Sequence, residues 1–130
     1  MAPAIPVKKR PKHLDLTKIH LPLPGLVSIL HRVSGAALFL IGIPFLLWVL
    51  HCSLANQQGF DGWRDTFNHP LVKLIVIGFL WAYLHHFFAG LRFLALDLHI
   101  GISLPAARTS SRWVLIVSLA LTLMFGVWLW

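Results

Sequence analysis

Two adjacent histidines, His85 and His86, interrupt an otherwise apolar stretch of the chain. Successive residues of a helix point about 100° apart, so the two imidazoles cannot serve one site equally. Gly90 follows His86 by one helical turn and lies on the same face. A glycine there leaves room for a flat macrocycle, and imidazole is a common axial ligand of haem iron. The spacing favours His86 as a haem ligand, with a buried histidine hydrogen-bonded to a neighbouring helix as the alternative.

A second group of polar residues opens an earlier apolar segment. Ser28 and Arg32 share a helix face, so a hydroxyl and a guanidinium could together hold the carbonyl oxygen of a quinone. His31 and Arg32 could donate charge-assisted hydrogen bonds to haem propionates. The plainer alternatives are a capping or back-bonding role for Ser28 and snorkelling to the lipid headgroups for Arg32.

The expected depths of the histidines indicate a partner chain. With Asp97 at the inner boundary, His86 lies about 16 Å deep at a rise of about 1.5 Å per residue. By the same rise His31 lies about 7 Å deep, about 9 Å too shallow to be the second axial ligand. His51 is at the other end of its segment, and residues 112–130 contain no histidine. We therefore expect the second ligand to come from another chain.

The elements that position these residues follow from composition. The chain has 130 residues, 58% hydrophobic and 12% charged, with mean hydropathy +0.78. These values exclude an ordinary soluble domain and a disordered chain. Crossing a bilayer takes about 20 apolar residues, and residues 26–52, 71–97 and 112–130 qualify. We expect an all-α membrane protein in which a cytoplasmic N-terminal arm, residues 1–25, precedes a three-helix transmembrane domain, residues 26–130. Pro44 is expected to bend the first span without breaking it.

The basic residues predict the orientation of the chain. The formal net charge is +7, and nine of the eleven Lys and Arg residues fall on the side of the arm and the second loop, leaving only Arg64 and Lys73 on the other side. The positive-inside rule then places the N-terminus in the cytoplasm and the C-terminus in the periplasm. Trp48, Trp128 and Trp130 would mark the outer interface and Trp113 the inner one. Membrane orientation accounts for the charge better than nucleic-acid binding. The single Cys52 makes no internal disulfide, and no cleavable signal peptide is evident, which fits a bacterial inner-membrane protein.

Three longer motifs resemble one family. They are the run R-P-K-H-L-D-L at residues 10–16, the block S-x-x-H-R-x-S-G at residues 28–35, and H-x-x-x-G-x-R at residues 86–92, followed by Asp97. With three spans at matching spacing, they resemble the cytochrome b subunit of succinate dehydrogenase, the C subunit of the bacterial enzyme. The resemblance covers nearly the whole chain.

The resemblance implies a shared cofactor and a set of partners. The chain would be half of a two-chain helical bundle, in which haem b is held between it and a second anchor, the D subunit. His86 matches the ligand position, Ser28 and Arg32 match positions that contact ubiquinone, and His31 and Arg32 match positions near the propionates. The flavoprotein and iron–sulfur subunits would dock on the cytoplasmic face. The chain would be a non-catalytic anchor of respiratory complex II.

Two departures and three rival interpretations remain. Many relatives have a histidine where this chain has Phe93, so one propionate contact would be absent, and the doublet leaves His85 as an alternative ligand. The rivals are a fumarate reductase anchor working with menaquinone and a haem-free structural or transporter subunit. A self-sufficient di-haem cytochrome would need paired histidines at matching depths, which the predicted depths do not provide.

Overall fold

The computed structural model describes residues 20–130, and all regular structure in this part of the chain is helical. The prediction of an all-α fold is confirmed. The elements in chain order are α1 (Leu23–Ala37), the π-helical turn η1 (Leu38–Gly42), α2 (Ile43–Ala55), α3 (Gln57–Asn68), α4 (Pro70–Asp97) and α5 (Leu104–Leu129). Most of the expected arm, residues 1–19, lies outside the described residues, and its last residues already belong to α1.

Three helices are long and apolar enough to cross a membrane: Leu23–Ala55, Pro70–Asp97 and Leu104–Leu129. They fall on the three predicted segments, although α5 begins well before residue 112. Helices suit a bilayer because every backbone polar group between their ends is satisfied within the segment. The chain is therefore described as a multi-pass membrane protein.

The first of these helices runs without a break through a π-helical turn. In this turn the backbone N–H of Ile43 donates to the carbonyl of Leu38, and Pro44 follows directly. Proline has no N–H and its ring crowds the carbonyl one turn earlier, so an α-helix must adjust there. A π-turn is one of the recognised adjustments and is frequent near functional sites. The predicted continuity of the helix through Pro44 is confirmed.

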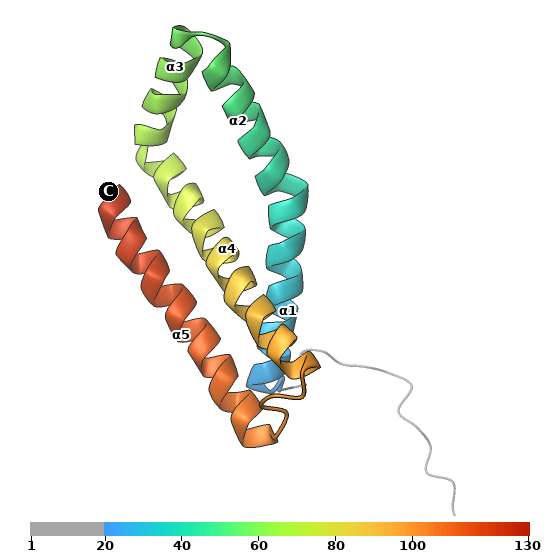
Figure 1. Cartoon of the computed structure of the whole chain (residues 1–130). Coiled ribbons are helices and arrows are strands. Elements are labelled where there is room, and N and C mark those ends of the chain that lie inside the picture. The colour runs from blue at the N-terminus through green and yellow to red at the C-terminus, as the bar shows by residue number, and fades with distance from the viewer. Residues whose placement is uncertain (1–19) are drawn as a thin grey trace, which may run out of the picture.

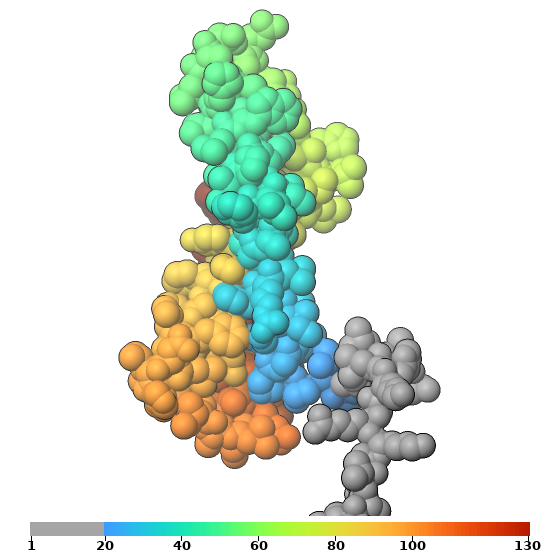
Figure 2. Space-filling model, turned by 90° about the vertical axis from the view of Figure 1, so that its right-hand side faces the viewer, coloured from blue at the N-terminus to red at the C-terminus, as the bar shows by residue number. Residues whose placement is uncertain are grey.

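The first long helix packs on α4 and α5 at one end and diverges from them toward α2, whereas α4 and α5 stay side by side (Figure 1). At the end near the 98–103 loop, α1 packs on both α4 and α5, while α2 packs on α3 and on neither long helix. In Figure 2 the upper part of α2 and α3, in green, projects well beyond the body of the molecule. The packing of all three long helices is thus confined to the region that contains the polar residues of α1 and the histidines of α4.

A stripe of small residues joins α5 to the rest of the bundle. Ser111, Ser118, Thr122 and Gly126 recur one or two turns apart, and all are buried. Small residues let helix backbones approach closely inside a membrane. The serine and threonine hydroxyls bond back to carbonyls of the preceding turn, so they bring no unsatisfied donor into the interface.

Candidate functional site

His86 makes its hydrogen bonds to the opposite helix, α1. Its Nδ1 lies 3.0 Å from the backbone oxygen of His31 and 3.4 Å from Ser34 Oγ. A carbonyl only accepts, so Nδ1 must carry the proton that is donated to His31 O. In a neutral imidazole the proton on Nδ1 leaves the lone pair on Nε2. Among residues 20–130 no hydrogen-bond partner lies at Nε2. The ring is therefore prepared to act as a ligand through Nε2.

A glycine on α1 admits the His86 ring. A Cβ added at Gly35 would lie 2.6 Å from Cε1 and 3.0 Å from Nδ1 of His86. The first distance is far below van der Waals contact, so any side chain at this position would displace the ring or the helix. Ser34, next to it, is buried and donates its own hydroxyl proton to His31 O at 3.0 Å. Gly90, the glycine that the sequence indicated, instead faces His31, whose Nε2 would be 3.6 Å from an added Cβ.

The rings of His31 and His86 stack on each other. Their centroids are 4.2 Å apart and their planes differ by 8°. The expected depth difference of about 9 Å at the helical rise is therefore wrong. That expectation began the first span at residue 26, but α1 begins earlier, at Leu23, so His31 lies farther from the inner end of its helix; α4 ends at Asp97, as expected. Face-to-face contact leaves no space for an iron between the two rings, so they cannot be the two axial ligands of one haem.

His85 has a different environment from its neighbour. It is completely buried, packs its ring 5.4 Å from that of Trp81 and lies close to the backbone of Val27. Neither of its ring nitrogens has a hydrogen-bond partner within the described residues. The two histidines therefore lie in different surroundings, and His85 faces the interior of this chain, between neighbouring helices.

Ser28 and Arg32 lie on α1 beside the face that meets α4. Ser28 is half-buried and Arg32 is exposed, and within residues 20–130 neither side chain makes a hydrogen bond. Phe93 packs against the ring of His31 at 5.1 Å between centroids. An apolar ring there supports His31 but offers no hydrogen bond.

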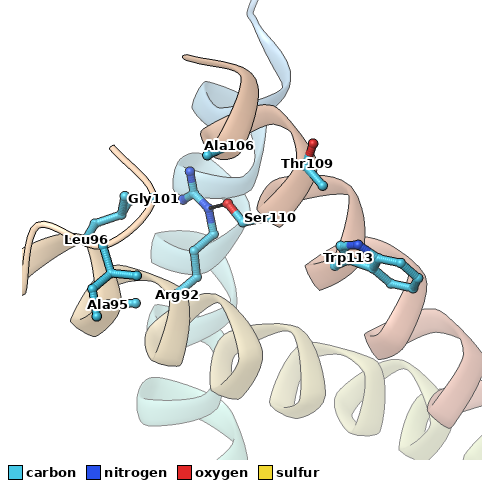
Figure 3. Close-up of a pocket in the computed structure, with 9 residues that line it drawn as sticks. Arg92, Ala95, Leu96, Gly101, Ala106, Thr109, Ser110 and Trp113 are labelled. Carbon is cyan, nitrogen blue, oxygen red and sulfur yellow. Dashed lines mark hydrogen bonds between the residues drawn. The ribbon is translucent and has the colours of Figure 1, made fainter. Parts of the chain in front are cut away.

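Arg92 joins α4 to α5 and does more than mark the inner end of a span. It is 8% exposed; its Nε donates to Ser110 Oγ at 2.9 Å and its Nη2 to the Ala107 carbonyl at 3.5 Å. Figure 3 shows the guanidinium between Gly101 and Ser110, at a pocket of about 360 Å³ beside the 98–103 loop. Its Nη1 is buried and has no partner among the described residues. The sequence did not predict this connection.

These features define a small multi-pass helical membrane protein with one imidazole presented as a candidate metal ligand. A family model described as "Succinate dehydrogenase/Fumarate reductase transmembrane subunit" matches residues 6–125. The chain therefore belongs to this family, and the resemblance predicted from its motifs is confirmed.

Individual relatives agree with the family match. The chain is 42% identical to the succinate dehydrogenase cytochrome b556 subunit of Coxiella burnetii (strain RSA 493 / Nine Mile phase I), over 94% of this chain and 98% of that protein. It is 30% identical to the subunit of the same name from Paracoccus denitrificans, over 88% of each chain. The corresponding subunit of Rickettsia typhi is 29% identical over 92% of each chain.

Proposed function

We propose that this chain is a membrane anchor of a bacterial succinate dehydrogenase, that it binds haem b through His86, and that it forms part of the ubiquinone site. The chain carries no succinate chemistry. That chemistry belongs to the flavoprotein and iron–sulfur partners, which dock on the cytoplasmic face. A second anchor, the D subunit, supplies the other axial ligand. The complex lies in the inner membrane.

The donor set of His86 carries the proposal. Metal-bound histidines commonly donate their other ring N–H to a carbonyl or carboxylate, which fixes the tautomer and raises ligand basicity. His86 does this through Nδ1 and His31 O, and leaves Nε2 free. The residues present therefore fit a haem ligand. When bound, haem b supplies a one-electron carrier. His31 stacks on one face of the His86 ring, so it cannot be the second axial ligand of the same haem. This supports a second ligand from another chain.

Ser28 and Arg32 would act on the quinone. Arg32 would stabilise negative charge that develops on a quinone oxygen during reduction, because a preorganised cation is most effective where charge appears. The Ser28 hydroxyl would donate a hydrogen bond to the same oxygen. Arg32 would also contact a propionate together with His31, and in this chain Phe93 removes the contact that relatives make from that position.

The first test is an optical spectrum of the complex purified through a tag on this chain. We expect b-type absorption in the wild type and its loss in His86→Leu. An unchanged spectrum in His86→Leu would exclude the ligand assignment, and absence of haem from the wild-type complex would favour a haem-free structural subunit. Identification of the co-purified chains tests the partners.

The second test separates quinone chemistry from assembly. Arg32→Leu should lower quinone reduction about 100- to 1000-fold, the size expected for removing one donor to developing charge. Succinate oxidation by soluble dyes should stay near wild type. Equal loss of both activities would mean failed assembly and would contradict the proposal. The wild-type complex turning over faster with menaquinone than with ubiquinone would favour the fumarate reductase anchor.

A further inference from the structure

We propose that Gly35, Ser34 and the backbone carbonyl of His31 form a seat on α1 that sets the ring plane and the tautomer of His86. The seat positions the ligand and does not itself touch iron. This inference rests on the proposed function, since it assigns positioning residues to the haem ligand proposed there.

Hydrogen bonding carries the first part of the argument. Three polar atoms converge: His86 Nδ1, His31 O and Ser34 Oγ are separated by 3.0 Å, 3.0 Å and 3.4 Å. Ser34 gives its hydroxyl proton to His31 O, so its lone pairs are left to face the N–H of His86. The carbonyl and the hydroxyl both require the proton on Nδ1. Together they exclude the tautomer in which Nε2 is protonated and unable to bind a metal.

Steric fit carries the second part. Gly35 touches the edge of the ring that contains Nδ1 and Cε1, and an added Cβ would lie 3.6 Å from Nε2 as well. His31 covers one face of the ring by stacking at 4.2 Å. The ring is thus limited at one edge by α1 and on one face by His31. Rotation about the bonds of the side chain would bring it against one of these surfaces.

The position of Gly35 in its helix adds a reason for the fit. The amide of Leu38, at the entrance of the π-turn, lies within reach of the carbonyls of Gly35 and Ser34 together. The change from α to π hydrogen bonding therefore begins directly after the seat. Pro44 and the seat lie on either side of this turn, so the backbone can adjust to the proline without moving the residues that hold His86.

The test compares two glycine-to-alanine variants in the purified complex. Gly35→Ala places a methyl group against the His86 ring. Gly42 lies on the same long helix as Gly35, and a methyl group there would meet Phe79 of α4 at an ordinary 3.5 Å, so Gly42→Ala is the matched control. The readouts are haem content, the low-spin paramagnetic resonance signal of oxidised haem, and carbon monoxide binding by reduced haem, which requires a vacant axial position.

We expect Gly35→Ala to lower haem affinity by about 10- to 100-fold, the usual effect of losing an outer-shell partner of a metal ligand. The haem that remains should bind carbon monoxide, and Gly42→Ala should match the wild type. A Gly35→Ala complex with wild-type spectra and no carbon monoxide binding would overturn the proposal.

Ser34→Ala decides the question if Gly35→Ala does not assemble. This variant removes one acceptor near Nδ1 and adds no bulk. His86 should then be a weaker ligand and donate less charge to oxidised iron. The midpoint potential of the haem in this variant should therefore rise, while its haem content stays close to wild type. An unchanged midpoint potential would contradict the proposal that the seat positions His86. Retention of the low-spin signal in His86→Leu would instead overturn the proposed function, and so the two failures are distinguishable.

Discussion

Adjacent residues of one type have opposite roles in this chain. Among residues 20–130, His86 directs one ring nitrogen to α1 and makes no hydrogen bond with the other, while His85 is wholly buried and neither of its nitrogens has a partner. The angle of about 100° between successive helical residues is enough to produce this difference. The same reasoning separates Arg32, which is exposed on α1, from Arg92, which is buried between helices. Residue type alone identified the candidates, and the neighbouring helix decides which of them can bind a ligand.

Arg92 and Ser110 allow a prediction at the scale of single residues. Ser110→Ala leaves the Nε of a buried guanidinium without the acceptor that now lies at 2.9 Å. An unsatisfied buried donor on a charged group costs about 1–3 kcal/mol or more. Arg92→Met removes the buried charge together with the N–H donors that require acceptors, and replacing a buried charged group by an apolar one is often nearly neutral for stability. We therefore expect Ser110→Ala to lower the melting temperature of the purified complex more than Arg92→Met does.

Thr109→Ala is the control for this pair, because Thr109 is exposed on the same turn and lines the same pocket. It should melt with the wild type. A larger loss of stability in Arg92→Met than in Ser110→Ala would mean that the arginine is a net source of stability, contrary to the argument.

At the scale of helices, the small stripe of α5 determines how closely it approaches α4. A Cβ at Gly126 would lie 3.5 Å from Ile77 Cδ1, which is ordinary contact. Gly126→Ala should therefore be tolerated. Gly126→Leu would force extra bulk into a packed interface, at a cost of about 1–3 kcal/mol, and should lower the melting temperature of the complex. Gly78→Leu on α4 is the matched control, since nothing lies within 4 Å of a Cβ there. Equal melting of the two leucine variants would contradict this account.

The sequence predicted the helices better than their register. Hydropathy located all three long helices, because about 20 apolar residues are needed for each crossing. It could not determine which residues of neighbouring helices face each other, since this depends on where each helix begins and how they cross. The assumed level ends of α1 and α4 therefore placed His31 too shallow, and the space above Gly90 was assigned to a macrocycle although His31 lies there.

The candidate site shows the same limit. His86, His31, Ser28 and Arg32 were identified because polar groups are rare in apolar segments. Gly35 and Ser34 were recognised only as members of the S-x-x-H-R-x-S-G block. Their spacing from His31 on α1 was a usable signal, but its meaning depended on contact with His86, which is more than fifty residues away in the chain. Contacts of this kind are set by helix crossing and not by local pattern.

At the scale of the whole molecule, the first long helix is longer than the apolar core of a bilayer is thick. The first long helix, Leu23–Ala55, has 33 residues, so it extends about 50 Å at the helical rise, against an apolar core of about 30 Å. Gly42 of the first long helix packs near Phe79 of α4. The two helices run in opposite directions, so Trp48 and Lys73, which are equally far from this contact, lie at about the same height. Lys73 donates to the backbone oxygen of Trp130 at 3.3 Å. We expect these residues to lie near the outer boundary of the membrane, so that the end of α2 extends past it.

In that outer part, α3 covers α2 with its aromatic side. The ring of Trp63 packs 5.8 Å from that of Phe45 and 5.1 Å from that of Trp48. Gly59 lies against the backbone oxygen of Cys52, so close that no side chain would fit. The polar residues of α3, including Asp61, Arg64 and Asp65, are exposed. An amphipathic helix of this kind covers one apolar side of α2 and leaves its polar face exposed.

The orientation of the chain gives a prediction for the molecule as a whole. Arg92, Arg108 and Arg112 lie at the end that contains the 98–103 loop, whereas Lys73 lies at the end of the C-terminal Trp130. The excess of Lys and Arg should hold the loop end in the cytoplasm. Alkaline phosphatase, which folds only in the periplasm, should be active when fused after Trp130 and inactive when inserted after Gly101. A fluorescent protein that matures only in the cytoplasm should give the opposite pattern at both points. Phosphatase activity at Gly101 with none at Trp130 would reverse the orientation and move the positions of Ser28 and Arg32 away from the cytoplasmic side on which the iron–sulfur partner is proposed to dock.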